Sequence, residues 1–321
     1  MRKSRDYLND DGRPPDGRDT RVDDTTAMRR ALAAGPGVVF VEPGYYRLGE
    51  VTIPEGVVVQ GSGTATVFCS SGPKHIFLQC DVFRWAIRDV LFDGEAEGGW
   101  QDRQDLGESG VSVSRCKAYE IAGVRFQNFS GAGLHITWSA QPGPGGWCDG
   151  GNLDRITAEG NYIGVHFDVR AEYMNATQLS CYRNVIGCAI HAGNTKIAAS
   201  NLCSNRTGLY IEDKENGSHG AISNCLINHN LEMAMHCRSV GNGMSIDNCC
   251  FFCGRLLIED SRGVNVTSGT LSCDVEVRGG QANRIAGNYI IESQCTFSAS
   301  PATIFEGNFT DEGPWEAGEQ E

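Results

Sequence analysis

The sequence predicts an all-β protein, a single-stranded parallel β-helix with a short N-terminal capping helix. Three observations lead to this prediction. An apolar residue followed by small or polar residues recurs about every 20 residues over most of the chain. The segments between these repeats are short, alternate apolar with polar residues and are rich in Gly, Ser and Asn. No amphipathic helical pattern follows Ala34, so the short strands must wind into coils that stack on one another.

The repeat is marked by the apolar residue that leads each coil. These leaders are Ile87, Ile121, Ile156, Leu179, Ala199, Ile222, Ile246, Val266 and Ile285. A leucine-rich repeat has a similar period, but its run of spaced leucines is absent. Two insertions, residues 94–109 and 138–151, lengthen the early steps, and insertions in solenoids lie in surface loops, often beside a binding face.

A second strand in each coil determines which side chains point inward, because side chains alternate across a strand. The residues expected to be buried include Val165, Phe167, Ile190, Ile211, Met235 and Ile258. The polar residues between them form two outward ladders with the ordinary inter-strand spacing of about 4.8 Å. The first ladder is Ser112, His135, His166, Ala189, Tyr210, His236 and Leu257. The second is Ser114, Thr137, Asp168, His191, Glu212, Arg238 and Glu259.

Charge, hydropathy and cysteine content exclude several classes of protein. The net charge of −13 argues against a nucleic-acid partner, whose phosphates would be repelled. A membrane-spanning helix needs about 18 consecutive apolar residues, and no apolar run in the sequence is nearly that long. We therefore expect no membrane partner. The 14 cysteines include no two CxxC pairs at zinc-finger spacing. We therefore expect free thiols packed as small apolar residues, and neither a metal nor a cofactor.

The predicted domains follow one another simply along the chain. Residues 1–20 are charged and predict an extended arm that could serve as a docking segment. Residues 21–50 contain the capping helix and a strand, residues 51–310 the β-helix, and residues 311–321 an acidic tail. The helix has N-cap oxygens from Asp23 to Thr26 and ends at Gly35. Its apolar face consists of Ala27, Met28, Ala31 and Leu32.

This cap carries a resemblance to a known family. Asp23-Asp24-Thr25, the helix, and then Gly37-Val38-Val39-Phe40-Val41 with Pro43-Gly44 are similar to the N-terminal capping segment of the pectate lyase-like superfamily. The segment is most like that of bacteriophage tail spike and tail fibre proteins. The resemblance covers about 30 residues, and the coils support it over most of the remaining chain. It implies a right-handed β-helix, a polysaccharide ligand and a homotrimer.

Titratable residues gather on successive coils of the outward ladders, which is unusual for a merely solvated surface. Asp168 and Glu212 are two coils apart, about 9–10 Å between backbones, and their side chains can shorten this to the separation of an inverting glycosidase pair. His191 lies between them and could act as the base itself. We therefore predict the catalytic residues Asp168, Glu212, His191 and Tyr210.

Two other interpretations of these ladders stay open. Elimination from a uronic acid needs a base, an acid and a cation, and His166, Tyr210 and Arg238 could supply them. Alternatively the face binds sugar without catalysis or is plain surface. The predicted substrate-binding residues are His166, His236, Arg238, Glu259, Trp100 and Trp147. The two tryptophans lie in the insertions, where they suit stacking on sugars or folding back as lids.

Motifs of one enzyme family within this superfamily are mostly missing. Gly217-Ser218-His219-Gly220 faintly resembles the Gly-His-Gly of polygalacturonases. Their Asn-Thr-Asp is absent, and the only Asp-Asp pairs lie in the arm and the cap. Polygalacturonase activity is therefore not expected from these residues.

Three hypotheses of function follow. The first is a phage tail spike or fibre in the virion, which binds and, if catalytic, depolymerises a host surface polysaccharide, with other virion tail proteins as partners. The N-terminus lacks the apolar stretch of a secretory signal, and assembly in a host cytoplasm would suit unpaired cysteines. The second is a secreted, monomeric cellular polysaccharide lyase or glycoside hydrolase. The third is a non-catalytic structural virion protein.

Overall fold

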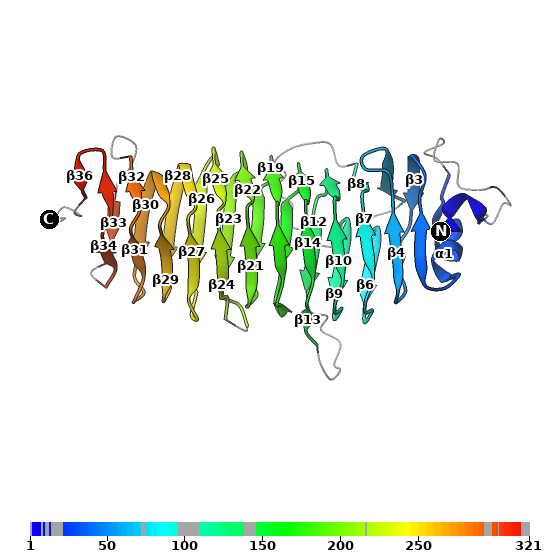
Figure 1. Ribbon diagram of the computed structural model, residues 1–321, viewed down its shortest axis with the longest axis horizontal. Helices are drawn as coiled ribbons and strands as arrows, with labels where there is room; N and C mark the ends of the chain where they lie inside the picture. The colour runs from blue at the N-terminus through cyan, green and yellow to red at the C-terminus, as the bar shows by residue number, and fades with distance from the viewer. Residues whose placement is uncertain are drawn as a thin grey trace.

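The computed structural model describes residues 2–7, 9, 13, 22–71, 75–95, 109–137, 146–215, 217–291, 297–300 and 302–315. These residues form a long parallel β-helix whose two ends carry the two termini (Figure 1). The predicted fold class is therefore confirmed. The described part of the chain has one α-helix, α1 (Thr25–Ala33), and no helix there is long and apolar enough to cross a membrane.

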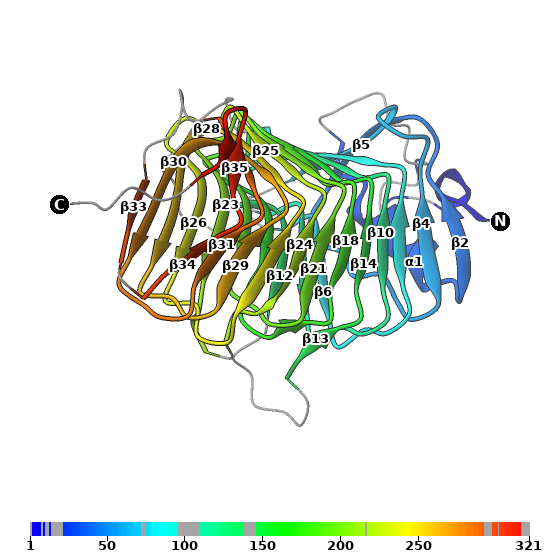
Figure 2. The same cartoon turned by 60° about the vertical axis from the view of Figure 1, so that its left-hand side comes forward.

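Each coil contributes strands to three faces, which we call A, B and C. Face A is a 13-stranded parallel sheet, visible as a row of aligned strands in Figure 2. Its strands are β1 (Arg2–Lys3), β2 (Gly37–Phe40), β4 (Val57–Gln60), β7 (Ala86–Arg88), β10 (Glu120–Ala122), β14 (Asn152–Asp154), β18 (Asn175–Thr177), β21 (Thr195–Ala198), β24 (Gly220–Ser223), β27 (Met244–Asp247), β29 (Val264–Thr267), β31 (Arg284–Ala286) and β34 (Ile304–Glu306).

Faces B and C belong to one 21-stranded sheet, joined by two long strands that continue round the corner. Those strands are β28 (Cys250–Glu259) and β30 (Thr270–Arg278). The other strands of face B are β3 (Gly44–Leu48), β5 (Thr66–Ser70), β8 (Leu91–Asp93), β11 (Arg125–Gln127), β15 (Thr157–Glu159), β19 (Ser180–Tyr182), β22 (Asn201–Cys203), β25 (Leu226–Asn228), β32 (Tyr289–Ile290) and β35 (Phe309–Thr310). The other strands of face C are β6 (Phe77–Cys80), β9 (Val111–Ser114), β12 (Ala132–Thr137), β16 (Ile163–Phe167), β20 (Ile186–Ile190), β23 (Thr207–Glu212), β26 (Met233–Arg238) and β33 (Phe297–Ala299).

Two small pairings remain: one forms a separate two-stranded sheet, and the other adds the last strand of the 21-stranded sheet to face B. The short strands β13 (Cys148–Asp149) and β17 (Ala171–Glu172) pair in parallel, and β36 (Gly313–Pro314) turns back to pair antiparallel with β35. A strand that reverses onto its neighbour shields part of an open sheet edge.

The pairing corrects the alignment of the leading residues. Ile222 pairs with Ile197, not with Ala199. Ile156 and Leu179 directly precede strands of face B, and Ala199 is the corner residue between faces A and B, with φ 50°. The repeat length is about the same on faces A and B, and each coil has inward apolar residues on both sides of the corner. The sequence therefore does not show on which side of the corner a leading residue lies. The corner residue itself gave no signal, since in most coils it is not glycine.

The corners between faces B and C are held by a ladder of buried asparagines. The side-chain oxygens of Asn184, Asn205 and Asn230 each accept the backbone N–H of the preceding asparagine at 2.9–3.0 Å. The first of the series, Asn161, accepts the N–H of Phe129 at 3.0 Å. Their amide groups donate to backbone carbonyls of neighbouring coils. Each asparagine therefore satisfies backbone groups that a buried corner would otherwise leave unpaired.

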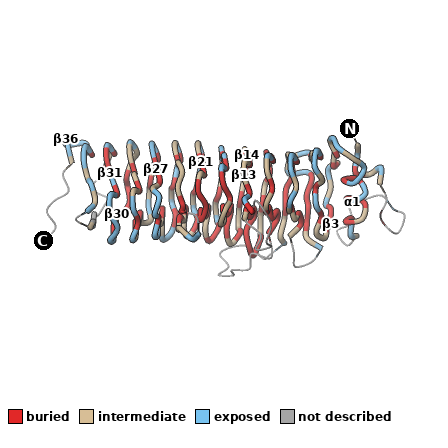
Figure 3. Tube along the Cα trace, turned by 90° about the horizontal axis from the view of Figure 1, so that it is seen from below, coloured by how far each residue is buried: buried red, intermediate tan, exposed pale blue. Residues whose placement is uncertain are grey.

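The main core is one continuous apolar cluster along the inside of the coils. Figure 3 shows how buried residues recur along the solenoid. All six residues predicted to point inward on face C are fully buried. The cap is also as predicted, because Ala27, Met28, Ala31 and Leu32 are buried against the first coils. The first residues of the predicted arm join the solenoid, since β1 pairs with β2 and Asn9 accepts the N–H of Ala27 at 3.1 Å. The cysteines of the described residues are unpaired and most of them are buried, as expected.

Candidate functional site

The polar ladder predicted on face C is in the predicted register. His135 pairs with His166, Ala189 with Tyr210, and Tyr210 with His236. Face C therefore presents these side chains at the same height on successive coils. The second ladder continues past the strand ends, because the N–H of Asp168 donates to the carbonyl of Ile136 at 2.8 Å.

Five rings form a continuous row along face C. His135 stacks on His166 with centroids 5.0 Å apart, and His166 meets His191 edge to face at 4.9 Å. The row continues from His191 to Tyr210 at 5.8 Å and from Tyr210 to His236 at 5.4 Å. Because the backbone holds each ring on its own coil, the row is built without a flexible loop.

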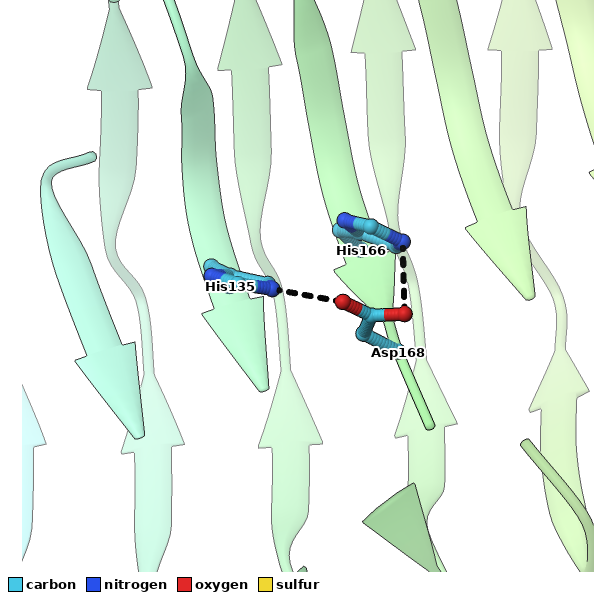
Figure 4. A group of neighbouring side chains, drawn as sticks. All are labelled: His135, His166 and Asp168. Atoms are coloured by element: carbon cyan, nitrogen blue, oxygen red, sulfur yellow. Dashed lines mark hydrogen bonds and ion pairs between the residues drawn. The ribbon is translucent and has the colours of Figure 1, made fainter. Parts of the chain in front are cut away.

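Asp168 is the centre of a hydrogen-bonded cluster at the start of this row (Figure 4). Its Oδ2 lies 3.1 Å from His135 Nε2, and its Oδ1 lies 3.3 Å from His191 Nδ1 and accepts the N–H of Val169 at 2.9 Å. Burial alone would raise the pKa of Asp168. The hydrogen bonds from His135 and His191 outweigh burial and hold this pKa well below its usual value, so the carboxylate is ionised at neutral pH.

His166 is the most deeply buried ring of the row, at 2% exposure. Its Nε2 lies 3.0 Å from His191 Nδ1 and 3.6 Å from Asp168 Oδ1. Burial lowers the pKa of His166 well below its ordinary value, and the neighbouring His135 lowers it further, so the ring is neutral. Its Nδ1 is buried and has no hydrogen-bond partner among the described residues.

A pocket of about 380 Å³ opens beside the cluster, over β16, β20 and β23. His191 and Glu212 meet in it, with His191 Nε2 3.7 Å from Glu212 Oε2. Burial raises the pKa of Tyr210, and the charge of Glu212 raises it further, so its hydroxyl stays protonated. The pocket is lined by Tyr162, Ile163, His166, Ile186, Ala189, His191, Tyr210, Glu212 and Lys214.

Beyond the pocket, charges of both signs alternate along the second ladder. Arg238 lies 3.7 Å from Glu212 and 3.8 Å from Glu259. His236 Nε2 is 3.4 Å from Glu259 Oε2. Burial lowers the pKa of His236, and Glu259 opposes this effect. This end of face C therefore offers both hydrogen-bond donors and acceptors to a ligand.

The structure brings the four predicted catalytic residues onto three consecutive coils of face C. His191, Tyr210 and Glu212 line the pocket, whereas Asp168 lies behind His191 and is bonded to it. Sequence reasoning missed Lys214, which lines the pocket from the turn after β23, where the repeat pattern carries no signal.

The predicted substrate-binding residues do not all lie at the pocket. His166 lines the pocket but is almost fully buried, and His236, Arg238 and Glu259 lie farther along the face. Trp147 is 40% exposed and packs against Arg170, whose guanidinium carbon is 5.7 Å from the ring centroid. Trp100 lies outside the described residues.

Two further features bear on the chemistry. Gly217-Ser218-His219-Gly220 lies at the corner between β23 of face C and β24 of face A, and the Ser218 hydroxyl donates to the carbonyl of Glu212 at 2.8 Å. His219 and Gly220 line a separate hollow of about 730 Å³ with Arg262 and residues of β27. His135, His166 and Asp168 each offer a potential metal-ligand atom, and these atoms lie within 4.8 Å of one another. The full set of ligands could not be read from the sequence, because His135 comes from the coil before the one that carries His166 and Asp168.

Comparison with known proteins shows the fold. No protein-family model matches the chain, and no curated protein matches it. A mutant tailspike protein of E. coli bacteriophage HK620, solved in complex with a pentasaccharide, superposes with a TM-score of 0.67 at 13% identity, over 98% of this chain and 66% of that one. The N-terminal fragment of bacteriophage Phi29 gene product 12 gives a TM-score of 0.66 at 14% identity, over 96% of this chain and 62% of that one.

A bacterial enzyme module shares the fold over nearly its whole length. The A-module of the Azotobacter vinelandii mannuronan C-5 epimerase AlgE4 gives a TM-score of 0.59 at 15% identity, over 97% of both chains. The structural neighbours of this protein are thus phage tailspikes and epimerase β-helices, which confirms the resemblance at the level of fold. The chain spans about two thirds or less of the phage proteins described above.

Proposed function

We propose that the protein is a β-helix of the tailspike type that binds an extended polysaccharide along face C. The observation that carries this proposal is the pocket on face C, where the partly exposed ring of Tyr210 lies beside the hydrogen-bonding groups of Glu212 and Lys214. Sugar rings have apolar faces and hydroxyl edges, so they suit a surface that alternates aromatic rings with polar groups. The structural neighbour from phage HK620 holds a pentasaccharide, which supports a sugar ligand for this fold.

Cleavage of the bound sugar is a second candidate, favoured by the contacts of His191. Its Nδ1 is 3.3 Å from Asp168 and its Nε2 is 3.7 Å from Glu212. We propose that these three groups work as one proton-transfer unit, in which Asp168 orients His191 and Glu212 reaches the substrate. Tyr210, protonated in the same pocket, would donate its proton to a leaving oxygen.

The proposed setting is a virion, with the chain in a homotrimer attached to other tail proteins. The phage structural neighbours support this setting. Mass photometry of the purified chain tests it. A trimer supports the virion setting, whereas a monomer favours the alternative of a secreted cellular lyase or hydrolase.

The test of binding and cleavage uses a panel of bacterial capsular and O-antigen polysaccharides. Surface plasmon resonance reports binding, a reducing-sugar assay reports cleavage, and ultraviolet absorbance reports unsaturated uronate. New reducing ends without absorbance support hydrolysis, and both signals together support elimination. Binding should be lost in Tyr210→Ala and kept in Asp247→Asn, a control on face A. Equal binding by both variants would remove face C as the sugar site.

A further inference from the structure

Three potential ligand atoms meet at one point of face C. His166 Nε2, His191 Nδ1 and Asp168 Oδ1 form a triangle with sides of 3.0, 3.3 and 3.6 Å. A tetrahedral zinc site with bonds of 2.0–2.1 Å separates its ligand atoms by about 3.3 Å. The three side chains therefore have the separations of a metal site.

We propose that His166, His191 and Asp168 bind a divalent transition-metal ion of the zinc class. Two imidazole nitrogens and one carboxylate oxygen are a donor set typical of such ions, and unlike the all-oxygen sets of calcium and magnesium. Three protein ligands leave at least one coordination position for water or for an oxygen of a ligand.

Hydrogen bonding alone leaves one unfavourable feature in this cluster, whichever of the two histidines carries the proton between them. If His191 holds the proton on Nδ1, then His166 accepts at Nε2 and carries its own proton on Nδ1, a buried atom without a partner among the described residues. If His166 holds the proton on Nε2, then His191 Nδ1 turns a lone pair toward Asp168 Oδ1 at 3.3 Å. A cation is attracted by all three lone pairs at once, so it replaces the lone-pair repulsion of the second arrangement with attraction.

The surroundings hold the carboxylate in position for an ion. The second oxygen of Asp168 is 3.1 Å from His135 Nε2 and 3.5 Å from the hydroxyl of Thr137, so both can donate to it. A ligating carboxylate is commonly fixed in this way by an outer hydrogen bond. His135 is thus a positioning residue for the ion site. Two of the ligands, His166 and Asp168, lie on one coil and His191 lies on the next, so the paired backbones hold all three close together.

The ion site is compatible with the pocket and does not depend on the proposed function. An ion on Nδ1 of His191 leaves its Nε2 directed at Glu212, while Tyr210 and Lys214 still line the pocket. Such an ion would take over from Asp168 the task of orienting His191. Ion uptake is measured without any sugar, so failure of one proposal leaves the other standing.

The experiment is a metal titration of the full chain carrying Cys253→Ser, which removes the one thiol that is exposed among the described residues. After treatment with a chelator, the protein is titrated with Zn²⁺ against a competing indicator and with Co²⁺ under visible spectroscopy. We expect one ion per chain and a cobalt ligand-field spectrum without a thiolate charge-transfer band. No stoichiometric uptake at micromolar Zn²⁺, or a thiolate band, would overturn the proposal.

Variants identify the ligands. Asp168→Asn and His191→Gln should each weaken zinc binding about a hundredfold or more, and His135→Gln about tenfold, as outer partners do. His229→Gln is the matched control, because it removes an exposed histidine on a turn and should bind zinc as the parent does. His166→Gln should also lose the ion, but its buried site could impair folding, so the first two variants decide. Unchanged zinc affinity in both of them would refute the assignment.

Discussion

Ile211 lies fully buried on the inner side of face C, and its substitution tests the register of the solenoid. Ile211→Asp should prevent soluble folding, because a buried carboxylate without a partner costs several kcal/mol. The measurements are soluble yield and a thermal melt. Ser245→Asp places the same charge on an exposed position of β27 and should leave both unchanged. A normal melt for the Ile211 variant would show that this side chain does not point inward.

The residues of the proposed proton-transfer unit can be neutralised with little change of shape. If the protein cleaves its polysaccharide, Asp168→Asn and Glu212→Gln should each lower turnover by about a hundredfold or more, the usual contribution of a positioned acid or base. Sugar binding should persist, because each variant keeps the size of the side chain. Asp247→Asn on face A serves as the control. Full turnover in the Glu212 variant would exclude this carboxylate from the chemistry.

Alternation along single strands was enough to predict which residues of face C share a surface. It gave the ladder from His135 to His236, because the two-residue period of a strand leaves no other choice of face. It could not predict that Asp168 would bond to His135 and His191, since those contacts depend on side-chain rotamers across three coils. Lys214 escaped prediction because turns have no period.

At the scale of one element, the asparagine ladder makes a separate prediction. Asn184 accepts the N–H of Asn161 at 2.9 Å and donates to the carbonyl of Ala158 at 3.0 Å, all within the core. Asn184→Ala should lower the free energy of unfolding by about 1–3 kcal/mol, the penalty of a buried unpaired polar group. Urea denaturation measures this, with the exposed Asn175→Ala as control. Equal effects of the two substitutions would mean that the ladder adds no stability.

The corners also mark the limit of prediction for elements. Strand periodicity predicted the coils but aligned Ile156, Leu179 and Ala199 with leading residues that lie on face A. Ile156 and Leu179 instead precede strands of face B, and Ala199 is a corner residue. The corner turns over a single residue with positive φ, such as Arg155 or Gln178. Such a conformation is usually a glycine signal, and here non-glycine residues adopt it because the stacked coils impose it.

For the whole molecule, the buried thiols should be unreactive while the fold is intact. Burial raises the pKa of both Cys181 and Cys237 to about 12, so the reactive thiolate is scarce at neutral pH. We expect a thiol reagent to label the exposed Cys253 quickly and the buried cysteines only after denaturation. Reductant should leave the melting temperature unchanged. A large loss of stability in reductant would instead reveal disulfides.

The length of the row of five rings can be compared with the length of an oligosaccharide. Its members stand on five successive coils, from β12 to β26, and four steps of about 4.8 Å make a span of about 19 Å. One coil advances by roughly the length of one sugar unit in an extended chain, so in the proposed binding mode each coil of face C would contact about one sugar. Affinity for oligosaccharides of increasing length should therefore rise up to four or five sugars and then level off, and calorimetry on a size-graded series would read that limit directly.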